Sequence, residues 1–283
     1  GWLWEDIGNY YGAGANGLTI HDNQYKMVFS STAGEGRPAR FLRVEPHFEE
    51  TKVMNEVTCG PASSGDQAYI FAAPYDETVF VRGTIPAGHE EFKIKGSLQD
   101  PAHFAASQLY QKLEKAGITI KGDAQSMIRA GDWREQRKMR HTLLTLQSPT
   151  LSEIVKVTNQ KSVNLFAEHL LKMIGFKVKE SGSTSAGLEA IKEWLEEQHL
   201  NLDGFWMQDG SGLSRLNAVN AELITGFLAQ QKEADYFDDF LASLNVSGRK
   251  GSLYYLGKGT NLEGKVMAKS GTMSRVRAYA GYL

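Results

Sequence analysis

The sequence lacks the features that mark several common classes of protein. Cys59 is its single cysteine, which excludes an internal disulfide and a cysteine-rich zinc site. No apolar run approaches the roughly 20 residues that span a bilayer. Lysine and arginine number 31 against 33 aspartate and glutamate, a formal charge of −2, so composition gives no electrostatic reason for a nucleic-acid partner or an anionic membrane. We therefore expect no nucleic-acid partner and no transmembrane segment in this chain.

Spacings typical of metal sites and targeting segments are also missing. The seven histidines form no H-x-x-H or H-E-x-x-H pattern. The segment Asp209-Gly-Ser-Gly lacks the acidic ladder of a calcium loop, and we interpret it as a structural turn. The N-terminus has neither the basic nor the apolar region of a signal peptide. We expect no metal and no cofactor.

Two patterns follow one another along the chain. Short runs rich in aromatic and β-branched residues, separated by Gly, Pro, Asp and Ser, predict a β module over residues 17–96. The runs are 17–21, 24–29, 41–44, 67–71, 78–82 and 91–95. Helical periods follow from Asp100-Pro101, a predicted N-cap and first helical position, and the stretch 186–199 is clearly amphipathic. Helices packed on a sheet, with a β module before them, predict an α+β fold.

The tetrad Lys269-Ser-Gly-Thr272 lies on the first strand of a predicted C-terminal hairpin, because residues 275–283 alternate after it. The lysine ammonium and the threonine hydroxyl can hold a carboxylate by charge-assisted hydrogen bonds. Gly271 leaves room for another backbone, so this edge can bind an extended peptide that ends in a carboxylate. Four residues by themselves fit a basic hairpin strand better than a binding site.

A second motif, Ser162-Val-Asn164, stands about one hundred residues before the tetrad. Serine and asparagine are poor helix formers, and at a helix junction they can point a hydroxyl and an amide into a cleft. This order of motifs, together with S-x-x-K, is the signature of penicillin-binding proteins and class A β-lactamases.

Longer segments extend the resemblance over the whole chain: residues 159–172, 209–215 and 264–273, with Ala280-Gly-Tyr and the opening Gly-Trp-Leu-Trp-Glu-Asp. They resemble the D-alanyl-D-alanine carboxypeptidase/endopeptidase family, the class C low-molecular-mass penicillin-binding proteins, which are serine peptidases of family S13. The resemblance implies a transpeptidase-like domain, similar to β-lactamases, with helices on an antiparallel sheet and an inserted all-β module. Residues 1–16 and 97–283 would belong to the transpeptidase-like domain and residues 17–96 to the module. The periplasm or cell envelope is the implied location.

The resemblance also implies roles for the motif residues. A serine of the family attacks the penultimate D-Ala and forms an acyl-enzyme, which water hydrolyses. Ser162 would relay protons to the leaving group, and Asn164 would hold the substrate amide. Lys269 would orient Ser162, while Thr272 would bind the terminal carboxylate and supply half of the oxyanion hole. The remaining predicted substrate-binding residues are Ser270, Gly271 and Met273, although Met273 equally fits the core. The implied partners are peptidoglycan stem peptides and, in the intact protein, β-lactam antibiotics.

One departure from the family pattern is serious. The family's nucleophile lies in an S-x-x-K motif before the Gly-Trp segment, and the single S-x-x-K here, Ser247-Gly-Arg-Lys250, stands after the second motif. We therefore expect no nucleophile in this chain, no covalent adduct with penicillin, and a fragment of the family's fold. Three alternatives stay open: a non-catalytic peptidoglycan-binding or scaffolding homologue, a β-lactamase, which the long β insertion disfavours, and a β module that docks a partner.

Overall fold

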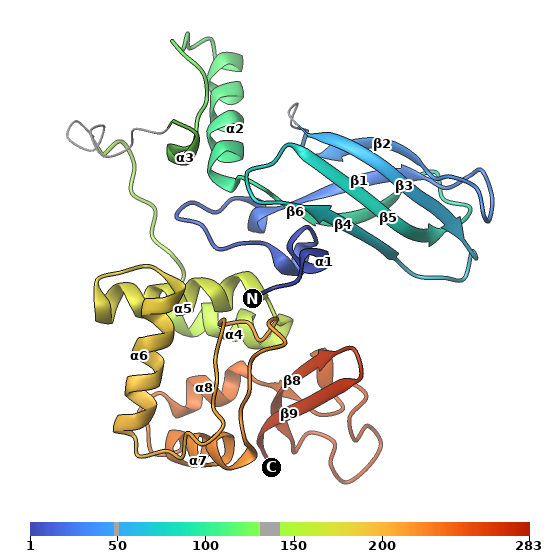
Figure 1. The fold of residues 1–283 in the computed structure, drawn as a ribbon. Helices are drawn as coiled ribbons and strands as arrows, with labels where there is room; N and C mark the ends of the chain where they lie inside the picture. Colours follow the sequence, from blue (N-terminus) through green and yellow to red (C-terminus); the bar gives the residue numbers. More distant parts are fainter. Residues whose placement is uncertain (48–50, 131–141) are drawn as a thin grey trace. The chain divides into compact units, whose positions relative to one another are not determined.

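The structure is a computed structural model that describes residues 1–47, 51–130 and 142–283 (Figure 1). Contacts divide the chain into two compact units, one of residues 2–145 and one of residues 146–283 together with Gly1. The sequence predicts domain limits after residues 16 and 96, which mark where a module would be inserted in the chain. These limits differ from the boundary near residue 145 between the two compact units. That assignment stays a prediction.

The unit of residues 2–145 is built on two three-stranded sheets (Figure 1). One has the strand order β2-β1-β6 and is antiparallel, and the other has the order β3-β5-β4, in which β3 and β5 run parallel. The strands are β1 (Gln24–Ser30), β2 (Arg40–Glu45), β3 (Lys52–Gly60), β4 (Gln67–Ala72), β5 (Thr78–Pro86) and β6 (Phe92–Ser97). Buried side chains from all six strands form one apolar core, which includes Met27, Val44, Val57, Ile70, Val81 and Ile94. The sheets therefore stabilise each other by burying their facing sides.

Five of the six predicted strand runs are confirmed, and two differences remain. Residues 17–21 form bends and the start of η2 (His21–Asn23) instead of a strand. The strand β3 was not predicted from the sequence, because its middle is polar. Asn55 is tolerated there because its amide donates to Ala39 O at 2.7 Å and its carbonyl accepts from Val57 N at 3.0 Å. The side chain of such a residue is hydrogen-bonded to the backbone, so it fits within the strand. It nevertheless interrupts the apolar alternation by which a strand is predicted from the sequence.

Short segments flank the sheets. The first is α1 (Trp4–Ile7), followed by η1 (Tyr10–Gly12). Asn9, between them, accepts from Ile70 N at 3.1 Å, which attaches this segment to β4. The predicted cap of α2 (Pro101–Lys115) is confirmed: Asp100 accepts from His103 N at 3.0 Å, and Pro101 is the first helical residue. The short α3 (Met127–Ala130) follows.

The unit of residues 146–283 is mainly helical. Its elements are α4 (Leu151–Lys161), α5 (Asn164–Lys179), α6 (Thr184–Glu197), α7 (Ala221–Gln231), α8 (Phe237–Ser243), β7 (Asn245–Val246), η4 (Gly251–Leu253), β8 (Met267–Met273) and β9 (Val276–Tyr282). Two glycines allow α5 and α6 to approach closely. A Cβ on Gly187 would lie 2.2 Å from Leu171 O, and one on Gly175 would lie 2.6 Å from Gly187 N.

The predicted C-terminal hairpin is confirmed. β8 pairs antiparallel with β9 from Met267↔Tyr282 to Met273↔Val276, and β7 pairs with the start of β8. Arg275, in the connecting turn, has a left-handed φ of 66°. The three-stranded antiparallel sheet β7-β8-β9 carries the tetrad on its middle strand.

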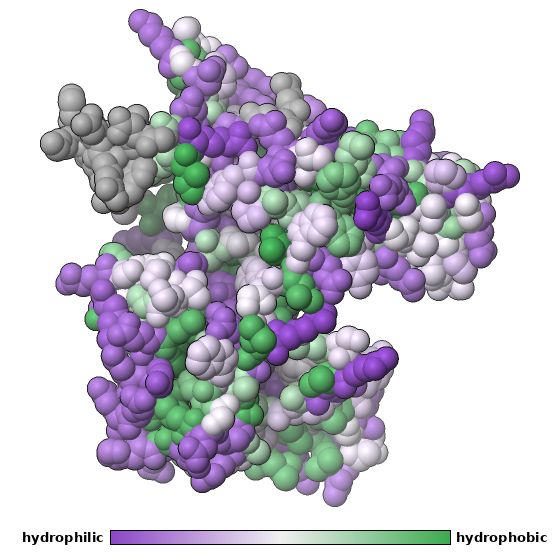
Figure 2. All heavy atoms as spheres, viewed as in Figure 1, coloured by the Kyte–Doolittle hydropathy of each residue, from purple (hydrophilic) through white to green (hydrophobic). Residues whose placement is uncertain are grey.

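Apolar side chains remain on the surface of this unit, where they gather over the helices (Figure 2). On α5 the exposed ones are Met173, Ile174, Phe176 and Val178. Among the helices that the structure describes, none combines the length and apolarity needed to cross a membrane.

Candidate active site

Ser162 and Asn164 lie at the junction of two helices, where such side chains can point into a cleft. Ser162 ends α4 in the left-handed conformation, with φ 54° and ψ 51°, and Val163 is the extended N-cap of α5. Asn164 is then the first residue of α5. The bend exposes Ser162 and leaves Asn164 partly buried. Short polar side chains tolerate this left-handed conformation better than bulky ones, which explains a serine here.

The junction is held by the helix end that precedes it. Asn159 donates to Ser243 Oγ at 2.8 Å, and Gln160 donates through its side chain to Ala242 O at 3.1 Å. Both acceptors lie at the C-terminal end of α8. Ser162 is thus positioned by tertiary contacts of the two residues that shortly precede it.

The structure brings the two motifs together. Lys269 Nζ donates to Ser162 Oγ at 2.9 Å, across 107 residues of sequence, and donates also to Ser270 O. Burial lowers the pKa of Lys269, because a partly desolvated ammonium is less stable in its charged form. Since Ser162 accepts from an ammonium, its own proton is available for donation elsewhere.

The strand edge beside Lys269 is open in the part of the chain that the structure describes. β7 pairs only with Met267 and Ala268, whereas β9 covers the opposite edge of β8 along its whole length. A Cβ on Gly271 would meet nothing within 4 Å, and Thr272 is exposed. In an antiparallel strand, alternate backbone groups point to each edge, so β8 offers hydrogen-bonding groups to an incoming peptide. Met273 is partly buried at the end of the strand.

Ser252 is a site residue that the sequence analysis missed. It lies in η4, and Ser270 Oγ donates to its Oγ at 2.6 Å. Gly251-Ser-Leu has the composition of an ordinary turn, so the sequence does not single out Ser252. Only the distance to Ser270 distinguishes it from other exposed serines.

The predicted turn at Asp209 is an irregular loop fastened to α5. Glu168 accepts from Gly210 N at 3.0 Å and from Ser211 N at 2.8 Å. Asp209 accepts from Gly212 N at 2.8 Å and from Ser214 N at 2.6 Å. Burial raises the pKa of Glu168. Both carboxylates therefore serve to fix the loop, and the described residues hold no cluster of three metal-ligating side chains.

Ser247, the serine of the S-x-x-K sequence, is fully buried. Its hydroxyl donates to Leu262 O at 2.6 Å and accepts from Val266 N at 3.1 Å. The hydroxyl thus serves the backbone of the 247–266 loop, which is a structural role.

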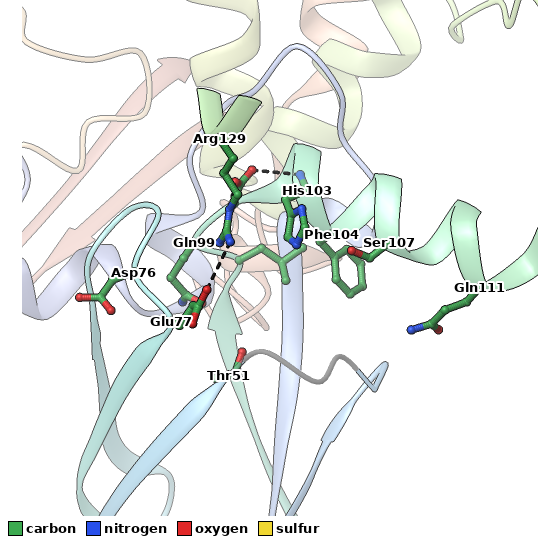
Figure 3. A pocket seen from close by; sticks show the side chains of 11 residues that line it. Thr51, Asp76, Glu77, Gln99, His103, Phe104, Ser107, Gln111 and Arg129 are labelled. Atoms are coloured by element: carbon green, nitrogen blue, oxygen red, sulfur yellow. Dashed lines mark hydrogen bonds and ion pairs between the residues drawn. The ribbon is translucent and has the colours of Figure 1, made fainter. Parts of the chain in front are cut away.

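A cavity of about 150 Å³ lies in the other unit, lined by Asp76 and Glu77 before β5, by residues of α2 and by Arg129 of α3 (Figure 3). Its charged lining is explained by helix capping. Asp100 accepts from Ser126 Oγ at 2.8 Å and from Arg129 Nε at 2.9 Å. It also accepts from His103 N, and Arg129 pairs with Glu77 (Figure 3). These bonds attach α3 to the start of α2. The carboxylate of Asp100 therefore has a structural role.

In the α+β unit of residues 146–283, an exposed serine therefore accepts from a lysine beside an open strand edge. The chain belongs to the D-Ala-D-Ala carboxypeptidase 3 (S13) family, whose model matches residues 1–283. This confirms the resemblance and the fold class predicted from the sequence.

Individual relatives agree with the family assignment. The chain is 32% identical to a D-alanyl-D-alanine carboxypeptidase of Actinomadura sp. (strain R39), over all of this chain and 53% of that protein. It is 22% identical to the D-alanyl-D-alanine carboxypeptidase DacB of Haemophilus influenzae, over all of this chain and 58% of that protein. The chain therefore spans about half the length of the curated relatives it matches.

A solved structure supports the fold. The crystal structure of penicillin binding protein 4 from Haemophilus influenzae matches 99% of this chain and 61% of its own length, with a TM-score of 0.79 and 21% identity. A second structure of that protein, titled as a complex with a novel β-lactam, matches 94% of this chain with a TM-score of 0.70.

Proposed function

We propose that the chain is part of a serine-type D-Ala-D-Ala carboxypeptidase or endopeptidase that acts on peptidoglycan stem peptides in the periplasm or cell envelope. The observation that carries the proposal is the 2.9 Å hydrogen bond between Lys269 Nζ and Ser162 Oγ beside the open edge of β8. The names of the family and of its relatives supply the reaction class.

The geometry suits the recognition of a peptide that ends in a carboxylate. The peptide lies along β8 over Gly271, and Lys269 and Thr272 bind its terminal carboxylate by charge-assisted hydrogen bonds. Thr272 N–H supplies half of the oxyanion hole, Asn164 holds the substrate amide, and Ser270 and Met273 are further substrate-binding residues. Ser162 donates its proton towards the leaving amine while Lys269 holds its oxygen.

The role of nucleophile stays unassigned in this chain. We propose that the chain by itself forms no covalent adduct with penicillin, because the buried Ser247 hydroxyl donates its proton to Leu262 O and accepts from Val266 N. Incubation with a fluorescent penicillin followed by intact-mass measurement tests this, and stoichiometric labelling at any serine of this chain would overturn it.

The reaction is tested on the protein at its full natural length. The substrate is an N-acylated tripeptide ending in D-Ala-D-Ala, and released D-alanine is measured. Replacing Ser162 by alanine removes a proton-transfer group, so we expect the rate to fall by about 10²–10⁴-fold. Ser185→Ala, which removes an exposed hydroxyl on α6, is the matched control and should leave the rate unchanged.

A second candidate is a non-catalytic peptidoglycan-binding protein. Ser247, the serine of the one S-x-x-K sequence, is buried and hydrogen-bonded to the backbone. This favours the second candidate, because the hydroxyl then has a structural role. Tight binding of the tripeptide without release of D-alanine by the full-length protein would select this candidate.

A further inference from the structure

Ser252 lies next to the tetrad but belongs to neither motif. It is an exposed residue at the centre of η4, and Ser270 Oγ donates to its Oγ at 2.6 Å. A short bond between two hydroxyls fixes the position of both oxygens, so Ser252 is held beside the strand that binds the peptide.

The buried side-chain amide of Asn245 is hydrogen-bonded to Ser252. Asn245 is 1% exposed, and its Nδ2 lies 3.2 Å from Ser252 Oγ and 3.2 Å from Gln160 O. A backbone carbonyl can only accept, so the atom that faces Gln160 O must be the nitrogen, which settles the orientation of the amide. The two amide protons then serve one acceptor each.

Gly251 locks this arrangement. It has a left-handed φ of 65°, and a Cβ on it would lie 2.1 Å from Asn245 Oδ1. The backbone of η4 is therefore packed directly against the amide.

The proton count of Ser252 follows from these bonds. A serine hydroxyl has two acceptor lone pairs and one proton. Asn245 Nδ2 and Ser270 Oγ donate to the two lone pairs, which leaves the O–H of Ser252 as a donor at the exposed side of the tetrad.

We propose that Ser252 is a further ligand-binding residue, which donates its O–H to the terminal carboxylate of the bound peptide, and that Asn245 is its positioning residue. The inference rests on the proposed function, since it assumes that the carboxylate lies at the tetrad. Asn245 suits this role because it also bonds to Gln160 O, two residues before Ser162, and pairs with Ala268 of β8. One buried residue thus contacts the helix end before Ser162 through its side chain and the strand that carries Lys269 through its backbone.

The experiment compares two probes on the full-length protein: the N-acylated D-Ala-D-Ala tripeptide and the same tripeptide with a C-terminal carboxamide. Ser252→Ala removes the donor from an exposed position, so the variant is expected to fold. We expect its dissociation constant for the carboxylate peptide to rise about tenfold, the usual effect of losing a hydrogen bond to a charged group. Binding of the carboxamide peptide should change by less than about twofold, since that probe carries no charge at this point.

Two further variants complete the test. Ser252→Thr keeps the hydroxyl and should restore the preference for the carboxylate. Thr260→Ala, in the same loop but bonded to Gly257 O, is the matched control and should bind as the wild type does. Equal losses for both peptides in Ser252→Ala, or no loss for either, would refute the role of Ser252.

A different outcome would refute the proposed function itself. If the wild-type protein itself bound the carboxylate and carboxamide peptides equally, the carboxylate site at the tetrad would be wrong. If Lys269→Met abolished the preference for the carboxylate but Ser252→Ala preserved it, the proposed function would stand and only the inference about Ser252 would be refuted.

Discussion

Replacing Lys269 by methionine should separate ligand binding from stability. Methionine keeps an unbranched side chain of similar length, so the packing of the aliphatic stem is retained. It removes the ammonium that donates to Ser162 Oγ at 2.9 Å and that faces the open edge of β8. A hydrogen bond to a charged group contributes about 1.5–3 kcal/mol, which corresponds to about a 10- to 150-fold loss of affinity for a carboxylate peptide.

The same substitution should leave the fold almost unchanged. Burial already lowers the pKa of Lys269, which means that the site disfavours its charged form. Removing the charge therefore offsets the loss of its hydrogen bonds, and we expect the melting temperature to move by less than about 3 °C.

Isothermal titration calorimetry with the carboxylate and carboxamide peptides measures the first effect, and calorimetric melting measures the second. Affinity for the carboxylate peptide within about twofold of the wild type would refute the reasoning, as would an equal loss for both peptides. A large fall in melting temperature would show instead that Lys269 is a structural residue.

Three other outcomes are expected. Because Lys269 binds a carboxylate only when protonated, affinity for the carboxylate peptide should fall as pH rises through its lowered pKa, below the ordinary value of 10.5; Lys269→Met should show a flat titration in that range. Gly187→Ala places a Cβ 2.2 Å from Leu171 O, so thermal melting should show a loss of about 1–3 kcal/mol, whereas Gly182→Ala, where a Cβ meets nothing within 4 Å, should melt as the wild type does. Ser247→Ala leaves two backbone groups without their partner and should cost about 1–3 kcal/mol in denaturant unfolding; unchanged stability would contradict its structural role.

Features that depend on neighbouring residues were predictable from the sequence. The cap at Asp100 and the hairpin of β8 and β9 each follow from local chemistry: a side chain that accepts from the first turn, and an alternating strand. The ordered motifs also predicted the family, which the family model confirms.

Two strand assignments from the sequence differ from the structure because the assembled sheet decides them. The run 17–21 has β-branched residues but forms no strand, because no neighbouring strand pairs with it among the described residues. In β3, Asn55 interrupts the apolar pattern, and its bonds to the backbone at positions 39 and 57 become visible only when the sheet is assembled.

The sequence by itself determined which residues form the hairpin and the tetrad, because turns and strand alternation are set by residues a few positions apart. The tertiary structure alone decided what these parts do together. The bond between Lys269 and Ser162 spans 107 residues, and the bond from Asn245 to Gln160 spans 85. Such contacts depend on how α4, α8 and β8 pack. The order of residues does not show which side chains of different elements will meet after packing. For the same reason Ser252 looks like any turn serine in the sequence, and only its 2.6 Å bond with Ser270 makes it part of the site.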